Sequence, residues 1–207
     1  AQSDNDACPD AGAGATAAEQ AVCWFDRHEA ADSTCTTDGV DRCLMNAAGW
    51  CHGVPLDDPR VREACFLAPL RAGRFEQAAE VAEYLSDASP SVSRCRDAVT
   101  GMLSGRVVSN PAGGEVTVDG RSYGPAPLEV QLPSPWWQRE IIVRFGDTPV
   151  TVTAEALGDA FDSRSCRLGD IVVEGPRSAA SSGPAEGARE GALGIAGRGL
   201  VGAGAAA

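Results

Sequence analysis

The sequence contains no lysine, because all 17 of its basic residues are arginine. This absence excludes enzymes that form a Schiff base with a lysine, and nucleotide-binding proteins whose phosphate loop needs one. Histidine is nearly as scarce: only His28 and His52 are present, and they do not form a close pair on one helix. Such a pattern is weak support for a metal centre. The sequence therefore predicts neither a bound metal nor a cofactor.

Acidic residues outnumber basic ones, and most of the negative net charge lies in the first half of the chain. The 207 residues carry a formal net charge of −12. Residues 1–104 hold 17 acidic residues against eight arginines, a net of −9, and residues 105–207 hold 12 against nine, a net of −3. Because an acidic chain repels nucleic-acid phosphates, we expect no nucleic-acid partner.

Cysteine, by contrast, is present in an even number at wide spacings, which favours disulfides. No Cys-x-x-Cys pair occurs, and this argues against zinc ribbons and thioredoxin-type redox sites. The chain begins at Ala1-Gln2 without methionine. This fits a mature protein after removal of a signal peptide, although an artificial start would look the same. We therefore expect a periplasmic, extracellular or cell-surface location.

The positions of the cysteines suggest a pairing scheme. Seven of them precede residue 96, so at least one disulfide must join the two halves if all eight pair within the chain. Cys95 is the cysteine nearest to Cys166 in sequence, so we expect these two to form that disulfide. Eight cysteines allow 105 connectivities. The scheme that we expect is Cys95–Cys166, Cys23–Cys43, Cys51–Cys65 and Cys8–Cys35.

The region from residue 16 to residue 104 is expected to be helical. Asp38 suits an N-cap, Pro59 suits a first helical turn, and Gly53 and Gly73 suit helix ends. The predicted helices cover residues 16–29, 39–51, 59–71, 75–88 and 90–105.

The region from residue 105 to residue 174 is expected to be a small antiparallel β-sandwich. Val116 and Val118 alternate with polar residues, which is the two-residue period of a half-buried strand. Asp119-Gly120 favours a tight hairpin turn. The predicted strands cover residues 106–109, 115–119, 128–132, 140–145, 150–153 and 170–174.

Two stretches resemble known families. The pattern Asn-Pro-x-Gly-x-Glu-Val-x-Val-Asp-Gly over residues 110–120, followed by Gly-x-x-Pro-Leu over residues 124–128, resembles the PEGA domain. This resemblance implies a small β module of microbial surface and envelope proteins that acts as a spacer or docking unit. The chain departs from that family at residues 134–139, where Pro-Trp-Trp-Gln replaces the usual Pro-Gly-x-His turn.

The second resemblance is confined to the helical region. Gly73, Phe75, Ala78 and Pro90 match in register the second half of a tetratricopeptide repeat. The resemblance implies helical hairpins in which the glycine lets one helix pack closely on its partner. Helical repeats often present a concave binding surface, which here would be acidic.

Trp136 and Trp137 are the candidate binding residues. If they lie on a strand, their side chains point to opposite faces, so one enters the core and the other is presented outward. An exposed tryptophan near Tyr123 would stack on a sugar or on a partner's side chain. The alternative is that both tryptophans pack between the two domains.

One motif matches that of serine hydrolases, but the residues that follow it do not suit a hydrolase. Gly120-Arg-Ser122-Tyr-Gly124 matches Gly-x-Ser-x-Gly, which needs a helix after the serine. Pro125 and Pro127 follow instead, and a hairpin is expected there. We therefore predict no catalytic residues and no enzyme activity.

The complete expectation is an α+β protein. A loose arm over residues 1–15 precedes disulfide-stapled, tetratricopeptide-like helical hairpins over residues 16–104. A PEGA-like β domain follows over residues 105–174, and then a flexible Gly/Ala/Ser/Pro-rich tail over residues 175–207. A membrane anchor beyond Ala207 is an alternative for attachment.

The expected role is a secreted or envelope scaffold or adaptor whose partners are other envelope proteins or cell-wall glycans. The alternative is a carbohydrate- or peptidoglycan-binding module that uses an exposed tryptophan.

Overall fold

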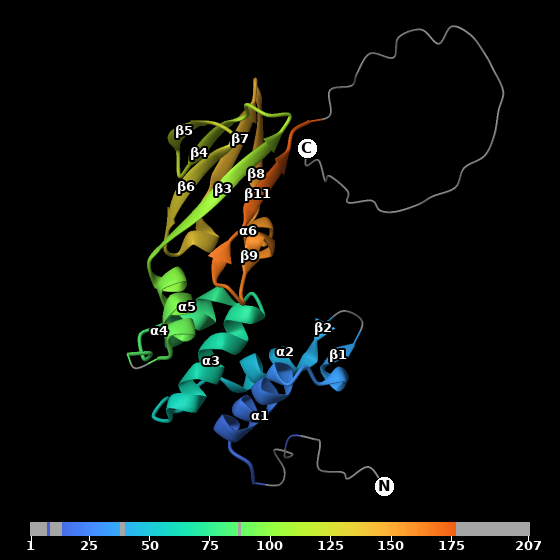
Figure 1. The fold of residues 1–207 in the computed structure, drawn as a ribbon, viewed down its shortest axis with the longest axis vertical. Coiled ribbons are helices and arrows are strands. Elements are labelled where there is room, and N and C mark those ends of the chain that lie inside the picture. Colours follow the sequence, from blue (N-terminus) through green and yellow to red (C-terminus); the bar gives the residue numbers. More distant parts are fainter. Residues whose placement is uncertain (1–7, 9–13, 38–39, 87, 177–207) are drawn as a thin grey trace, which may run out of the picture. The chain divides into compact units, whose positions relative to one another are not determined.

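The computed structural model describes residues 8, 14–37, 40–86 and 88–176 (Figure 1). These residues belong to one compact unit that ends at Pro176. They contain helices, β-sheets and four disulfides, which confirms the α+β class. Most of the expected arm and nearly all of the expected tail lie outside the described residues.

In the described part of the chain, five α-helices precede the two main sheets, as expected. Their bounds are α1 (Ala17–Glu29), α2 (Arg42–Trp50), α3 (Pro59–Arg71), α4 (Phe75–Ala82) and α5 (Pro90–Thr100). The expected start of α2 at Asp38 is wrong, because Asp41 caps this helix: its carboxylate accepts a hydrogen bond from the Leu44 N–H across 2.9 Å. Helices α4 and α5 also end earlier than predicted. Gly101 is the C-cap of α5, with φ −110° and ψ −142°, and a strand follows at Met102.

The Gly73 turn between α3 and α4 does not serve the role that the tetratricopeptide resemblance implies. Gly73 has φ +72°, a left-handed conformation that favours glycine. A Cβ built at this position would have no atom within 4 Å. Gly73 is thus required for the turn at the end of α3, and not for close contact between the two helices.

The β region consists of two main sheets (Figure 1). The first has the order β11-β3-β6, from β3 (Met102–Asn110), β6 (Leu128–Pro133) and β11 (Asp170–Glu174). The second has the order β5-β4-β7-β8, from β4 (Glu115–Val118), β5 (Arg121–Pro125), β7 (Ile141–Phe145) and β8 (Thr148–Val152). Two-residue strands form the pairs β1 (Thr36–Thr37) with β2 (Val40–Asp41), and β9 (Phe161–Asp162) with β10 (Arg167–Leu168).

One strand pair departs from the antiparallel pattern. β11 runs parallel to β3, with Asp170 beside Arg106 and Glu174 beside Asn110. Parallel neighbours need a connecting segment that brings the chain back to the starting end of the sheet. Here that segment includes α6 (Ala154–Ala160), a helix absent from the sequence prediction. The remaining pairs are antiparallel, as expected.

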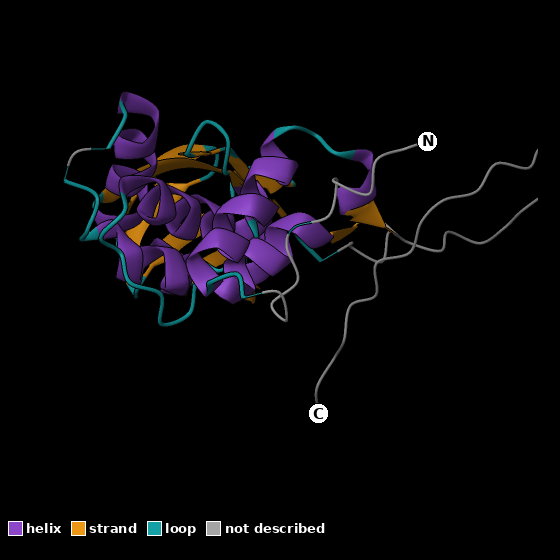
Figure 2. Ribbon diagram, turned by 90° about the horizontal axis from the view of Figure 1, so that it is seen from below, coloured by secondary structure: helices purple, strands orange, loops and turns teal. Residues whose placement is uncertain are grey.

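A single hydrophobic core runs through the helical and β regions. Phe66 of α3 and Val99 of α5 are fully buried in it, together with Leu132 of β6 and Ile141 of β7. Seen from below the view of Figure 1, the helices overlie the strands (Figure 2). Because the core is shared, the two regions bury apolar surface against each other as well as within themselves.

The disulfides agree with the expected scheme in two of four pairs. Cys95–Cys166 and Cys51–Cys65 are present. The expected pairs Cys23–Cys43 and Cys8–Cys35 are wrong. The structure joins Cys35 to Cys43 and Cys8 to Cys23.

The reason for the difference is the small β1–β2 hairpin, which the sequence analysis did not include. It pairs Thr36 with Asp41 and so folds the chain back between Cys35 and Cys43. Because Cys43 is bonded to Cys35, Cys23 on α1 pairs with Cys8.

Candidate functional site

Trp136 and Trp137 do not form the expected exposed site. They lie in η3 (Trp136–Gln138), a short 3₁₀ helix between β6 and β7, so the alternation of a strand does not apply. Trp136 is 0% exposed and Trp137 is 8% exposed. The expectation of an outward-facing tryptophan is therefore wrong, and the alternative, packing between the two regions, is what the structure shows.

The two tryptophans belong to an aromatic junction, made of Phe75, Trp136, Trp137 and Phe161. The Phe75 ring of α4 lies 4.8 Å from the Trp136 ring and 5.7 Å from the Trp137 ring, centroid to centroid. Phe161 of β9 lies 4.9 Å from Trp136. Aromatic pairs in these arrangements contribute more than their buried area alone. The junction therefore fixes the β region on the helices.

Tyr123, the third expected binding residue, lies apart from this junction. It is 38% exposed on β5, and the Arg121 guanidinium lies 5.8 Å from its ring centroid. Its neighbour Ser122 pairs with Thr117 in the β4–β5 hairpin. Ser122 is therefore on a strand that a further strand follows, and not on the strand-to-helix elbow that a hydrolase serine requires.

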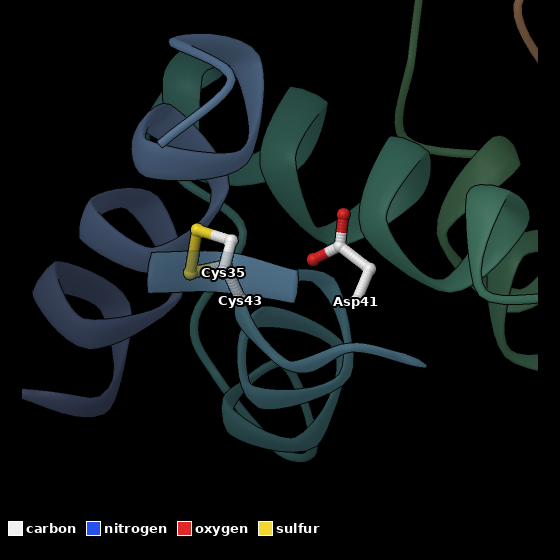
Figure 3. Close-up of side chains that lie close together, drawn as sticks. All are labelled: Cys35, Asp41 and Cys43. Atoms are coloured by element: carbon white, nitrogen blue, oxygen red, sulfur yellow. A yellow bond between two sulfur atoms is a disulfide. The ribbon is translucent and has the colours of Figure 1, made fainter. Parts of the chain in front are cut away.

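A cluster of metal-ligand residue types is also present, at Cys35, Asp41 and Cys43 (Figure 3). The two sulfur atoms are bonded to each other, so neither offers a thiolate to a metal. The Asp41 carboxylate is engaged as well: it caps α2 and lies 2.6 Å from Nδ1 of His28. His28 thus contacts an N-cap residue, and this cluster stabilises the hairpin.

A groove of about 940 Å³ lies between α1, the loop after α2, and the start of α3. We call it the α1–α3 groove. Its apolar lining comes from both sides: Ala18, Val22, Val54, Pro55 and Val61. Its polar lining consists mainly of charged side chains: Glu19, Asp26, Arg27, Asp57, Asp58 and Arg60. A volume of this size, with an apolar floor and a few polar groups, is typical of binding sites.

Caps fix the two helix ends that border the groove. Thr16 and Glu19 form a capping box at the start of α1, with the Glu19 N–H donating to the Thr16 hydroxyl across 3.2 Å. Asp58 caps α3 by accepting from the Arg60 N–H across 2.7 Å.

Two disulfides border the same groove. Cys23, which lines it, is bonded to Cys8. Cys51, at the end of α2, is bonded to Cys65 in α3. The loop over residues 52–58 is thus held at both ends, so the groove exists before any partner binds.

The charges around the groove are partly paired. The Arg60 guanidinium of α3 donates to both carboxylate oxygens of Asp26 on α1, at 2.7 and 2.8 Å, and this pairing raises the pKa of Arg60. Hydrogen bonds from the Thr16 backbone and hydroxyl lower the pKa of Glu19, so this carboxylate is ionised at neutral pH. Four carboxylates against two guanidinium groups leave an acidic rim.

No local sequence pattern marks this groove. Pro59 indicates where α3 begins, but a local pattern does not show which helices face each other. His52, dismissed as a metal ligand, lies on the groove lining.

Comparison with known proteins gives one match. The family model of the PEGA domain matches residues 103–135, which span β3 to β6 and end one residue before Trp136. No curated protein and no solved structure matches the chain. The resemblance in the β region is therefore confirmed, and the match does not extend to the helices.

The match and the disulfides together suggest an extracellular or envelope location. None of the helices in the described part of the chain is long and apolar enough to cross a membrane.

Proposed function

We propose that this protein is a non-enzymatic adaptor of the cell envelope or the extracellular space, and that it captures a segment of a partner protein in the α1–α3 groove. The PEGA-like β region acts as its spacer or docking module. The observation that carries the proposal is the groove itself, an apolar surface held open by two disulfides and two helix caps.

The occupant that fits is a polypeptide segment with apolar side chains and flanking arginine or lysine. Apolar side chains would cover Val22, Val54 and Val61 on the floor. Basic residues would face the acidic rim, where Asp57 and Asp58 are exposed. The net charge of −9 over residues 1–104 would also attract a basic partner at long range and accelerate association at low salt.

A rigid link between the two regions supports the adaptor role. Ser134 and Trp136 of the β region donate hydrogen bonds to the carbonyl oxygens of Val99 and Ala98 in α5, at 2.6 and 3.0 Å. The Cys95–Cys166 disulfide joins α5 to the β9–β10 turn. A partner held in the groove would therefore stay at a fixed distance from whatever the β region binds.

The test is peptide binding by fluorescence anisotropy to the intact, oxidised protein. A labelled 12-residue peptide of alternating leucine and arginine pairs serves as the probe, and the same peptide with glutamate in place of arginine is its control. We expect saturable binding of the basic peptide alone, and at least tenfold weaker binding in 500 mM salt.

A pair of variants locates the binding. Val22→Gln places a polar group on the groove floor, and we expect it to weaken binding about tenfold. Met45→Gln is the matched control, because Met45 is an exposed apolar residue of α2 that does not line the groove. Equal binding by both variants, or equal binding of the acidic peptide, would contradict the proposal.

A further inference from the structure

One edge of the sheet β11-β3-β6 is formed by β11, which has β3 as its single strand neighbour in this sheet (Figure 1). Alternate residues of a parallel strand turn their backbone N–H and C=O groups toward the neighbour. The N–H of Gly175, just after β11, donates a hydrogen bond to the Asn110 carbonyl oxygen of β3 across 2.7 Å. By this alternation, Asp170, Val172 and Glu174 turn their backbone groups away from β3, toward the free edge.

β11 lacks a feature that protects the other edges of the two main sheets. The edge strands β5, β6 and β8 each contain a proline, at Pro125, Pro133 and Pro149. Proline has no N–H to donate, and natural edge strands use it to prevent pairing with another chain. β11 contains neither proline nor glycine, and its pairing with β3 runs without a register shift over all five residues. Of the four edges of these sheets, β11 is therefore the most open to an added strand.

The middle of β11 presents an apolar side chain on the outer face of the sheet. Val172 is 61% exposed, the largest fraction among the large apolar side chains of the described residues. Beside it on β3, in register, lies the half-buried Val108. The end of α6 contacts the chain just before the strand, where the Ala160 carbonyl oxygen accepts from the Gly169 N–H across 2.8 Å. An added strand would cover the exposed valine.

Acidic side chains lie on both sides of this valine. Asp170 and Glu174 are exposed on the same face. In register with Asp170 lie Arg106 on β3 and then Glu129 on β6, so the charges alternate in sign from strand to strand. Glu174 accepts a hydrogen bond from the Asn110 amide across 3.0 Å, a neutral group that does not offset its charge. Because opposite charges on neighbouring strands stabilise a sheet, basic residues suit an added strand at both positions.

The same charges disfavour a second copy of this chain as the added strand. Two β11 strands related by a twofold axis at Val172 would place Asp170 opposite Glu174 at both ends of the pairing. Like charges directly opposite each other destabilise a strand pair. The charge pattern therefore favours a different protein as the occupant.

We propose that β11 is the docking edge of the β region and that it takes up, as a fourth strand, an extended segment of a partner protein with the pattern basic-x-apolar-x-basic. The apolar residue lies beside Val172, and the basic residues lie beside Asp170 and Glu174. The backbone of the segment bonds to the free N–H and C=O groups of β11. This inference rests on the proposed adaptor function, because it names the surface through which the β region docks.

The experiment is an NMR titration of the intact, oxidised, ¹⁵N-labelled protein with the peptide Arg-Thr-Val-Thr-Arg, flanked on each side by two glycines. The signal and the hydrogen exchange of the Val172 amide report on this edge. We expect a saturable downfield shift and about tenfold slower exchange of this amide at saturation. The same peptide with glutamate in place of arginine should bind about tenfold more weakly.

A charge-reversed variant and its control locate the binding. Asp170→Arg combined with Glu174→Arg reverses the charges beside Val172, and we expect it to prefer the acidic peptide over the basic one by about tenfold. Glu129→Arg combined with Asp147→Arg changes the net charge by the same amount at exposed residues outside β11. This control should keep the preference for the basic peptide.

An unmoved Val172 signal, equal binding of the two peptides, or an unchanged preference in the charge-reversed variant would overturn the proposal. Exchange of the Val172 amide that slows with rising protein concentration, without peptide, would also overturn it, because the added strand would then be a second copy. Val22→Gln in the α1–α3 groove should leave the shift at Val172 intact. The two surfaces are thus tested by separate readouts, and failure at β11 leaves capture in the groove standing.

Discussion

The indole N–H of Trp136, the first residue beyond the PEGA match, donates a hydrogen bond to the backbone carbonyl oxygen of Ala98 in α5 across 3.0 Å. Trp136 is fully buried between Phe75 and Phe161. The family match therefore ends next to a residue that joins the β region to the helices.

Replacing Trp136 should therefore destabilise the entire unit. We expect Trp136→Ala to lower the free energy of unfolding by about 3 to 5 kcal/mol through cavity formation. Trp136→Phe keeps an aromatic ring, but it loses the hydrogen bond and leaves a smaller cavity, so its cost should be about 1 to 3 kcal/mol. Urea denaturation monitored by circular dichroism measures both. Trp50→Phe, at a residue that is 37% exposed, is the control and should have little effect.

The disulfides should differ in how much they stabilise the folded protein, according to the length of chain between the two cysteines. Cys95–Cys166 spans 71 residues, and Cys35–Cys43 spans eight. From the entropy that the unfolded chain loses on loop closure, we expect a stabilisation of about 4 kcal/mol for Cys95–Cys166 and about 2.5 kcal/mol for Cys35–Cys43. Paired serine variants, Cys95→Ser with Cys166→Ser and Cys35→Ser with Cys43→Ser, should show this order in melting temperature. The reverse order would show that the long disulfide does not restrain the unfolded chain as argued.

Gly73 and Gly49 should respond in opposite directions to alanine. Gly73 has φ +72°, so Gly73→Ala forces a left-handed conformation on alanine and should cost about 1 kcal/mol. Gly49 lies inside α2 with open space around its Cα, so Gly49→Ala should stabilise by about 0.5 to 1 kcal/mol. Thermal melts of the two variants make the comparison. A cost well above this for Gly73→Ala would indicate close helix contact, as in the tetratricopeptide pattern.

The acid stability of the helical region should depend partly on Asp32. Hydrogen bonds from the backbone N–H and hydroxyl of Thr34, and then from Arg27, lower the pKa of Asp32 from 3.8 to about 2. Because the folded pKa is depressed, this stabilisation is present above pH 4 and is lost as the pH falls from about 4 toward 2. Asp32→Asn should be less stable than the native protein at pH 6, and the difference should shrink across that interval.

Chemical denaturation at a series of pH values checks the Asp32 prediction. Asp147→Asn is the matched control for loss of one negative charge, because no described residue donates a hydrogen bond to that exposed side chain. A difference between Asp32→Asn and the native protein that stays constant down to pH 2 would contradict the assignment.

Local signals in the sequence predicted most elements, because they depend on neighbouring residues. Pro59, which suits a first helical turn, located the start of α3. The alternation around Val116 and Val118 located β4. The single disulfide that joins the two regions followed from counting, since Cys166 is the only cysteine after Cys95.

Very short elements, and surfaces built from several elements, were not predicted. The β1–β2 hairpin has only two residues on each strand, too few for a periodic pattern, and its absence from the prediction gave two wrong cysteine pairs. The outward-facing tryptophan was expected on the condition that Trp136 and Trp137 lie on a strand, but the chain forms a 3₁₀ helix there. The α1–α3 groove is built from two helices and the loop between α2 and α3, so no local pattern marks its lining.

The Cys95–Cys166 bond also determines the route by which tension would travel through the molecule. A pull applied at Pro176 reaches Cys166 after only ten residues and passes through the sulfur atoms directly into α5. Residues between Gly101 and Ser165 lie inside the loop that this disulfide closes, so a force along the chain does not extend them. Under mechanical load, the PEGA-matching residues 103–135 would stay inside the loop that the disulfide closes, whereas β11, between Cys166 and Pro176, would bear the tension.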